Sequence, residues 1–191
     1  PDGKLRCRWS DAAPEFIEYH DGEWGFPVRD DQRLFEKLSL EGFQAGLSWS
    51  TILKRRETFR AAFSGFDIAA VAAFGPADVT RLMADPGIIR NAAKVDATIS
   101  NARITAELVD GHPGAFDELL WGFAPPRRAH RLSSWSELPA TTPESTAASA
   151  ALKKLGFRFV GPTTIYALMQ SSGMVDDHIA GCFIAEQADA A

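Results

Sequence analysis

The sequence predicts an all-α fold. Apolar residues recur at intervals of three and four through most of the 191 residues, which is the spacing of a helix that buries one face. Residues that favour a helix start precede several of these runs. Only residues 157–160 look extended, and one segment of this length cannot form a sheet.

Capping residues mark where the predicted helices begin. Asp30 or Asp31, Ser48 and Asp67 have side chains that accept hydrogen bonds from a first helical turn, and Pro76 suits the first helical position. Residues 125–145 are rich in Pro, Ser and Thr and are expected to form a long loop. The predicted helical segments are 31–45, 49–63, 68–71, a short helix from Pro76, 95–109, 116–123, 144–155 and 162–172.

Composition limits the class of protein. The net charge of −5 disfavours a protein that coats nucleic acid through bulk electrostatics, although local basic clusters occur at 54–56, 127–128 and 153–154. Each cluster also fits the solvated face of a helix or loop. The length favours one domain, or two lobes that share an interface.

The expected setting is a reducing cytoplasm. No apolar run approaches the ~20 residues that a membrane helix needs, and residues 1–10 lack the apolar stretch of a signal peptide. Two cysteines are too few for a disulfide framework, although one bridge between them stays open. We therefore expect a soluble protein with no membrane partner.

Glu41 is the first candidate functional residue, because it continues an apolar stripe. Seven residues turn a helix by about 700°, so Glu41 falls within roughly 20° of the face that carries Leu34. A carboxylate on a core-facing stripe costs free energy unless it is paired or faces a polar cavity. The alternative is a helix that frays at Gly42 and turns Glu41 out to water. A carboxylate in a pocket is a candidate for catalysis or for binding substrate N–H groups.

Aromatic residues are concentrated near the N-terminus, where Trp9, Tyr19, Trp24 and Trp49 all lie within the first 49 residues. The simplest interpretation is an aromatic-rich core. Because Trp and Tyr carry a polar atom and a large π face, they also suit a slot that stacks a flat heterocycle, especially a cationic one.

Two cysteines and two histidines form a candidate metal site. His178 and Cys182 are four residues apart and would share one face of a helix or tight turn, and Cys7 and His20 would complete a tetrahedral Cys2His2 zinc site. The alternative is two hydrogen-bonded histidines with two buried thiols or one disulfide. A zinc ion with four protein ligands would be structural, and it would join the two ends of the chain.

Residues 84–90, Ala-Asp-Pro-Gly-Ile-Ile-Arg, connect two predicted helices. This segment resembles the hairpin of helix-hairpin-helix DNA-binding proteins, in which a glycine turn and a helix N-terminus present backbone N–H groups to a phosphate. Asn91 and Lys94, early in the next helix, would add phosphate contacts. A Pro-Gly turn between helices is common, so this motif alone does not establish DNA binding.

Several segments in the same order resemble the bacterial 3-methyladenine DNA glycosylase I family, within the helix-hairpin-helix glycosylase superfamily. The similarity extends from about Cys7 to Cys182, and its most specific block is Leu-Glu-Gly-Phe-Gln-Ala-Gly-Leu-Ser-Trp at 40–49. The other matching segments are Arg-Cys-Arg-Trp at 6–9, Tyr-His-Asp-Gly-Glu-Trp-Gly at 19–25, Gly-Ile-Ile-Arg at 87–90, Gly-Phe-Arg-Phe-Val-Gly-Pro-Thr-Thr at 156–164 and Asp-Asp-His at 176–178.

The resemblance implies a fold and a base-binding site. It implies one glycosylase domain over residues 1–191, with a base pocket between two helical lobes and the helix-hairpin-helix at about 76–106. Glu41 would be the catalytic residue in that pocket. Tyr19 and Trp49 would stack on or line the flipped base, with Trp9 and Trp24 close by.

The resemblance also implies the zinc and DNA contacts. The four ligands Cys7, His20, His178 and Cys182 would hold one structural Zn²⁺. The residues expected to bind DNA are Gly87, Ile88, Ile89, Arg90, Lys94, Gln44, Gly46 and Leu47. Among these, Leu47 is our choice for the side chain that fills the gap left by the flipped nucleotide. Ala92 and Ala93 follow the hairpin where larger or basic residues would be unsurprising, so fewer phosphate contacts are expected there.

The implied activity is hydrolysis of the N-glycosidic bond of 3-methyladenine in alkylated DNA. The partners would be double-stranded DNA that contains the lesion and the free base as product, and the protein would act as a monomer near the nucleoid. No lysine lies where an amine nucleophile is required, so a monofunctional enzyme that leaves an abasic site is expected. Asp110 falls at about the position of the aspartate that many relatives use, but its context reads as a helix end.

Three other interpretations stay open. A non-catalytic helix-hairpin-helix module would bind DNA without cutting, and the combination of Glu41, Tyr19 and Trp49 disfavours it. A zinc hydrolase for a small molecule would need an open coordination position, whereas four protein ligands fill the zinc. A glycosylase of broader specificity, active on 3-methylguanine too, is a variant of the main interpretation.

Overall fold

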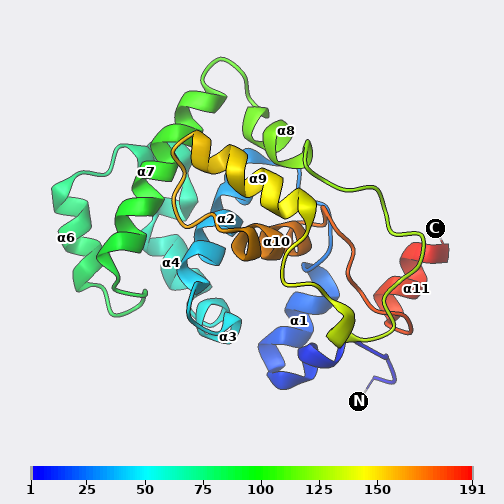
Figure 1. Ribbon diagram of the computed structural model, residues 1–191. Coiled ribbons are helices and arrows are strands. Elements are labelled where there is room, and N and C mark those ends of the chain that lie inside the picture. The colour runs from blue at the N-terminus through cyan, green and yellow to red at the C-terminus, as the bar shows by residue number, and fades with distance from the viewer. Residues whose placement is uncertain (1, 191) are drawn as a thin grey trace.

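The computed structural model describes residues 2–190, and this part of the chain contains helices and no strands (Figure 1). The all-α prediction is confirmed. The α-helices are α1 Pro14–Gly22, α2 Asp31–Gln44, α3 Trp49–Leu53, α4 Arg56–Ala62, α5 Ile68–Ala72, α6 Pro76–Ala84, α7 Ala92–Val109, α8 Ala115–Trp121, α9 Pro143–Lys154, α10 Pro162–Ser171 and α11 Phe183–Ala190. Short 3-10 turns occur at Arg8–Ala12, Ser64–Phe66 and Trp135–Glu137.

The predicted helix starts are confirmed by their capping bonds. The Asp30 carboxylate accepts from the Arg33 amide at 2.8 Å, and the Asp67 carboxylate accepts from the Ala70 amide at 2.7 Å. The Ser48 hydroxyl caps α3, and Pro76 is the first residue of α6. Each capped amide belongs to a first turn, where the helix offers no acceptor of its own.

Two sequence predictions differ from the structure. The predicted helix 49–63 is two helices, because the backbone leaves the helical path at Arg55 (φ −106°, ψ 4°). The segment 157–160 is not a strand, and Phe159 within it has a positive φ of 56°. The helices α1 and α11, which the periodicity did not define, hold the two ends of the chain.

The core lies around α2. Leu34, Phe35 and Phe43 of this helix are fully buried. Figure 1 shows α2 and α10 in the middle of the molecule with α9 across them, while α6 and α7 form the side farthest from α11. The apolar stripe of α2 is therefore covered along its length, and any polar group on that stripe is buried with it.

The two ends of the chain lie together. The Phe183 amide donates to the Leu5 carbonyl at 2.8 Å, and a second hydrophobic cluster combines Cys7, Tyr19 and Trp24 with Cys182. Figure 1 shows α11 beside the N-terminal segment. None of the helices over residues 2–190 is long and apolar enough to cross a membrane.

Gly173 should be essential to the packing of this region. Its φ is +71°, and a Cβ there would lie 2.5 Å from the Phe26 carbonyl carbon and 2.6 Å from the Pro27 nitrogen. We expect Gly173→Ala to lower the free energy of unfolding by about 2–4 kcal/mol, measured by urea denaturation.

The matched control is Gly65→Ala, because Gly65 has φ +67° with no atom within 4 Å of the added Cβ. That change carries the backbone strain alone and should cost about 1 kcal/mol. Equal losses in the two variants would show that the close approach at Gly173 contributes nothing.

Candidate active site

Glu41 is buried near the C-terminal end of α2, with 5% of its surface exposed. The helix does not fray at Gly42, which is itself buried and packs against Phe159. Because α2 continues to Gln44, Glu41 stays on the face that Leu34 and Leu38 bury. Of the two alternatives that the spacing leaves open, the buried carboxylate is correct.

The burial of Glu41 changes its ionisation. Removal from water raises the pKa of the Glu41 carboxyl from 4.5 to about 7, against the opposing effects of the Lys37 ammonium and the Ser171 hydroxyl. Burial also raises the pKa of Tyr19 well above its usual value, and the Glu41 charge adds to that shift. The carboxylate and the phenol are therefore close enough to interact. At neutral pH, Glu41 exchanges readily between its neutral and charged forms.

A chain of alternating charges continues from Glu41. The Lys37 ammonium donates to Glu23 at 3.0 Å, and the Arg56 guanidinium donates to the other Glu23 oxygen at 2.5 Å. Burial raises the pKa of Glu23, but Lys37 and Arg56 outweigh it, so the net pKa is lowered. The sequence patterns alone did not indicate a role for these three residues. The signal for Lys37 is its place four residues before Glu41, which puts both on one helix face.

The four predicted base-binding aromatics lie in one cluster. The rings of Tyr19 and Trp49 are 5.4 Å apart at 44°, and Trp9 lies 6.2 Å from Tyr19 and 5.2 Å from Trp24. Tyr19 and Trp24 are buried, and Trp9 and Trp49 are half-buried. The exposed ring of Trp135, from the long loop, lies 6.1 Å from Trp9.

Two indole donors in this cluster lack acceptors. The Nε1 atoms of Trp9 and Trp49 are buried without a hydrogen-bond partner in residues 2–190. A buried donor without an acceptor costs free energy, and such groups in native proteins usually have a reason. An aromatic cluster with two unpaired donors and a nearby carboxylate has the composition of a site for a flat heterocycle that offers both donors and acceptors.

Cys7, His20 and Cys182 could hold a metal ion. All three are buried, and their ligand atoms lie within 4.8 Å of one another. A hydrogen bond from the Cys7 thiol lowers the pKa of Cys182 to about 3 against the effect of burial, and His20 contributes to this shift. A sulfur that ionises readily suits metal binding, because the thiolate is the ligand form.

His178 lies beside this group with its ring 5.1 Å from that of His20. Its Nε2 atom is buried and has no partner among the described residues. The Nδ1 atom of each ring bonds a carboxylate oxygen at 2.8 Å, on Asp21 for His20 and on Asp176 for His178. A carboxylate on one imidazole nitrogen leaves the other nitrogen for a metal. The group whose ligand atoms lie within 4.8 Å of one another is Cys7, His20 and Cys182, and His178 lies next to it.

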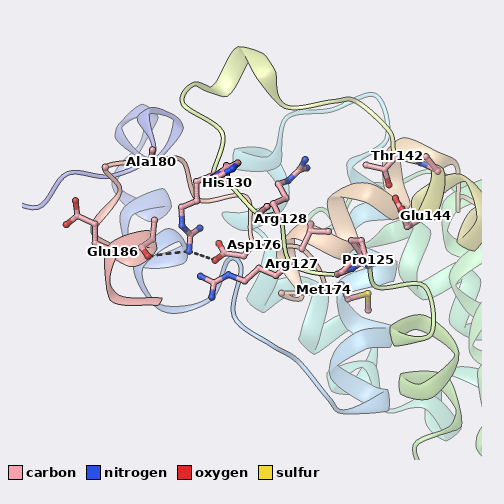
Figure 2. A pocket seen from close by; sticks show the side chains of 18 residues that line it. Pro125, Arg127, Arg128, His130, Thr142, Glu144, Met174, Asp176, Ala180 and Glu186 are labelled. Carbon is pink, nitrogen blue, oxygen red and sulfur yellow. Dashed lines mark hydrogen bonds and ion pairs between the residues drawn. The ribbon is translucent and has the colours of Figure 1, made fainter. Parts of the chain in front are cut away.

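A cavity of about 1060 Å³ lies between residues 125–131, 142–144 and 173–186 (Figure 2). Neither Glu41 nor any of the four clustered aromatic residues lines this cavity. Its arginines bond protein acceptors: Arg131 donates to Asp176 at 2.8 Å, and Arg128 donates to Asp177 at 3.3 Å. Because Asp176 in turn bonds His178, the wall of this cavity supports the Cys/His cluster.

The hairpin 85–91 joins α6 to α7 and is fixed by its own polar groups. The Gly87 amide donates to the Asp85 carboxylate at 2.7 Å, and the Gly87 carbonyl accepts from the Thr58 hydroxyl at 2.6 Å. A Cβ on Gly87 would lie 3.0 Å from both Asp85 Oδ1 and Thr58 Cβ, so a larger residue there would require these two side chains to shift by a few tenths of an ångström. The Gly87 amide, expected to bind phosphate, is therefore already occupied.

The hairpin residues after Gly87 differ from it in the hydrogen bonding of their backbone amides. Within the described chain no acceptor is found for the backbone amides of Ile88, Ile89 and Arg90. The Ile88 side chain is buried in the core, so only its backbone is available to a ligand, whereas the Arg90 side chain is exposed. The Asn91 side chain caps α7 by accepting from the Lys94 amide.

Lys94 does not point to solvent as a phosphate contact would. Its side chain is buried, and its ammonium donates to the carbonyls of Phe43 at 2.7 Å and Ala45 at 2.6 Å. The predicted phosphate contact by the Lys94 side chain is wrong, because its ammonium is buried and already bonded to carbonyls at the C-terminal end of α2.

The loop after α2 is exposed. Gln44 is half-buried, Gly46 has φ +81°, and Leu47 is 42% exposed. Asp110 is the exposed C-cap of α7, as its sequence context predicts. The structure thus places Glu41 close to Tyr19 of the aromatic cluster, and it leaves Asp110 exposed at the end of α7.

Solved structures with this architecture identify the class. The chain superposes on a crystal structure of 3-methyladenine DNA glycosylase I with a TM-score of 0.89 and 46% identity, covering 94% of this chain and 98% of that one. A tyrosine-to-phenylalanine variant of a 3-methyladenine DNA glycosylase I, in complex with 3-methyladenine, matches with a TM-score of 0.86 and 32% identity over 93% and 96% of the two chains. The fold is that of a DNA glycosylase.

The chain belongs to the methyladenine glycosylase family, which it matches over residues 9–185. It is 47% identical over 179 residues to DNA-3-methyladenine glycosylase 1 of Escherichia coli (strain K12), covering 93% of this chain and 95% of that protein. The resemblance stated from the sequence motifs is confirmed.

Lys37 should limit how far burial raises the pKa of Glu41. Replacing it in Lys37→Met removes a nearby positive charge, so the pKa of Glu41 should rise above about 7. Carbon-13 NMR titration of the glutamate carboxyl groups, with Glu41→Gln to assign the signal, measures this shift. Lys54→Met, which removes an exposed lysine paired with Glu15, should leave it unchanged. An unaltered Glu41 titration in Lys37→Met would contradict the proposed interaction.

Proposed function

We propose that this protein excises 3-methyladenine from alkylated DNA by hydrolysing the N-glycosidic bond. The observation that carries the proposal is a buried glutamate, Glu41, whose charge acts on Tyr19, a member of the aromatic cluster with Trp9, Trp24 and Trp49. The names of its relatives support the same reaction, and one similar solved structure is described as a complex with 3-methyladenine.

Recognition of the base follows from charge and shape. The 3-methylated adenine in DNA is cationic, so contact with aromatic faces favours it over adenine by about 1–2 kcal/mol for each well-placed ring. A cation in the pocket also favours the ionised form of Glu41, whose pKa of about 7 leaves it ready to release a proton. The carboxylate then accepts hydrogen bonds from base N–H groups, and the indole donors of Trp9 and Trp49 find acceptors on the same ring.

The DNA backbone would bind at the hairpin. The free amides of 88–90 and the exposed Arg90 side chain suit one phosphate, without regard to sequence. We place Leu47 in the gap left by the flipped nucleotide, with Gln44 and Gly46 shaping its loop. The base pocket then lies between two helical lobes of a single domain.

The reaction needs little acid catalysis. The glycosidic bond to a cationic base is already weakened, so the C1′–N bond breaks with its electron pair leaving on the base as neutral 3-methyladenine. A water oxygen bonds to C1′ and loses its proton to solvent. Flipping costs a few kcal/mol and least for a poorly paired lesion, which adds selectivity. Among residues 2–190, the lysine whose charge acts on Glu41 is Lys37, and its ammonium is ion-paired with Glu23. Without a free amine nucleophile there, the product would be an uncut abasic site.

Zinc would be bound by Cys7, His20, His178 and Cys182 as a structural ion. When bound, it would supply a crosslink between the chain ends and no Lewis-acid chemistry, because four protein ligands leave no open position. The carboxylates of Asp21 and Asp176 orient the two imidazoles for this task. In this proposal the protein acts as a monomer, and it repairs DNA at the nucleoid in the cytoplasm.

The test of the function is Glu41→Gln, assayed for release of 3-methyladenine from methylated duplex DNA. Loss of the charge should slow release by at least about 100-fold, while Glu57→Gln, on an exposed residue of α4, should retain full activity. No base release by the unaltered protein would favour a module that binds DNA without cutting it, and normal release by Glu41→Gln would remove Glu41 from the site.

The same variant has a signed stability effect. The pKa of Glu41 is raised from 4.5 to about 7 in the folded protein. The contribution of its protonated form to the free energy of unfolding is therefore fully present below pH 4.5 and is lost as the pH rises through 7. A glutamine side chain does not ionise in this range, so Glu41→Gln does not lose stability as the pH rises. Urea unfolding should therefore find Glu41→Gln more stable than the unaltered protein at about pH 9, and the advantage should disappear at about pH 4.

His178→Ala tests the fourth metal ligand. We expect zinc affinity to fall by more than about 100-fold, because even partners outside the ligand shell contribute 10–100-fold. Zinc content after dialysis and the melting temperature with and without a chelator measure this loss. The control is His130→Ala, on an exposed histidine of the cavity wall. Retention of stoichiometric zinc in His178→Ala would restrict the site to Cys7, His20 and Cys182.

A further inference from the structure

The ammonium of Lys94 caps the C-terminal end of a different helix. Lys94 lies in the first turn of α7, and its Nζ atom donates to the carbonyls of Phe43 and Ala45 at 2.7 and 2.6 Å. Phe43 belongs to the last turn of α2, and Ala45 is its C-cap. The last carbonyls of a helix have no partner within it, and a cation there interacts favourably with the helix dipole.

This arrangement is unusual in its charge balance. Lys94 is 7% exposed, and no carboxylate in residues 2–190 acts on the pKa of its ammonium. Burial accordingly lowers the pKa of its ammonium. A buried cation held only by carbonyl oxygens carries a desolvation cost that a methionine of similar length would avoid. Stability alone therefore gives a poor reason for a lysine at this position.

The two ends of the contact belong to different parts of the proposed DNA surface. On one side, α7 begins directly after the hairpin 85–91, and Asn91 caps the turn that contains Lys94. On the other side, Ala45 opens the exposed loop that carries Leu47, and Glu41 lies one helical turn before it on α2. A single side chain thus joins the phosphate-binding hairpin to the loop and to the helix end that holds Glu41.

We propose that Lys94 is a positioning residue that fixes the 44–48 loop relative to the hairpin. When the hairpin holds a phosphate, the Lys94 contacts set how far Leu47 reaches toward the base stack. This inference rests on the proposed function, because it assigns a role within flipping. It differs from a phosphate contact, since the ammonium is turned inward, and from a pocket contact, since Lys94 does not touch the aromatic cluster.

The role predicts that loss of Lys94 affects the duplex step and spares the pocket. Lys94→Met keeps the length of the side chain and removes both donors. With enzyme in excess, 3-methyladenine release from methylated duplex should slow by at least about tenfold, since small misplacements of reacting groups have effects of this size. The dissociation constant for free 3-methyladenine should change less than about twofold, because the pocket residues are untouched.

The matched control is Lys153→Met, which removes an exposed lysine from the last turn of α9. It loses the same charge near a helix end and should retain duplex activity. Lys94→Gln is the second variant. Its shorter, uncharged side chain keeps an N–H donor group, so its release rate should fall between those of Lys94→Met and the unaltered protein. It serves as the test if Lys94→Met does not fold.

Two results would overturn the inference. Unchanged duplex release by a folded Lys94 variant would show that the contacts do not position the loop. A parallel loss of free-base affinity would show that Lys94 supports the pocket instead. Failure of the proposed function is distinguishable, because the unaltered protein would then release no 3-methyladenine from the same DNA.

Discussion

The burial of one carboxylate constrains most of this structure. Glu41 sits on the apolar stripe of α2, where an isolated charge would cost far more than a domain can tolerate. Lys37 offsets part of that cost, and Glu23 and Arg56 extend the balance to α4. Glu41 itself is 5% exposed, so little water reaches it. The result is a carboxyl group with a pKa of about 7. A cation beside it would increase its ionised fraction at neutral pH, whereas an exposed glutamate is already ionised there.

Much of the fold is readable from local sequence. The caps at Asp30, Ser48 and Asp67 locate the starts of three helices, because these signals act over a single turn. The apolar spacing is less exact, since α7 begins at Ala92, before the first predicted position of that helix. The same argument locates Glu41 on a buried face. It fails at residues 49–63, where a change of direction at Arg55 splits one periodic run into two helices.

The site could be predicted only in part from the sequence, because it depends on contacts between residues that are far apart in the chain. Periodicity gives the face on which a side chain lies but not its partner on another helix. Lys94 looks like a phosphate ligand beside a hairpin, yet carbonyls some fifty positions earlier in the chain take its ammonium. The Cys/His cluster likewise joins residues from opposite ends, and only the family resemblance favoured it over two separate thiols.

The meeting of the chain ends has a consequence for how the protein matures. Trp9 and Trp24 pack against a cluster completed by Cys182, and Leu5 pairs with Phe183. During synthesis from the N-terminus, domains gain their contacts in the order in which segments leave the ribosome. The contacts of α2 with α3 and α7 can form before α10, at Pro162–Ser171, completes the core, and the aromatic cluster of Trp9, Tyr19, Trp24 and Trp49 is completed after that by the segment around Cys182. The aromatic cluster that is proposed to bind the base thus forms only after the segment around Cys182 has been synthesised.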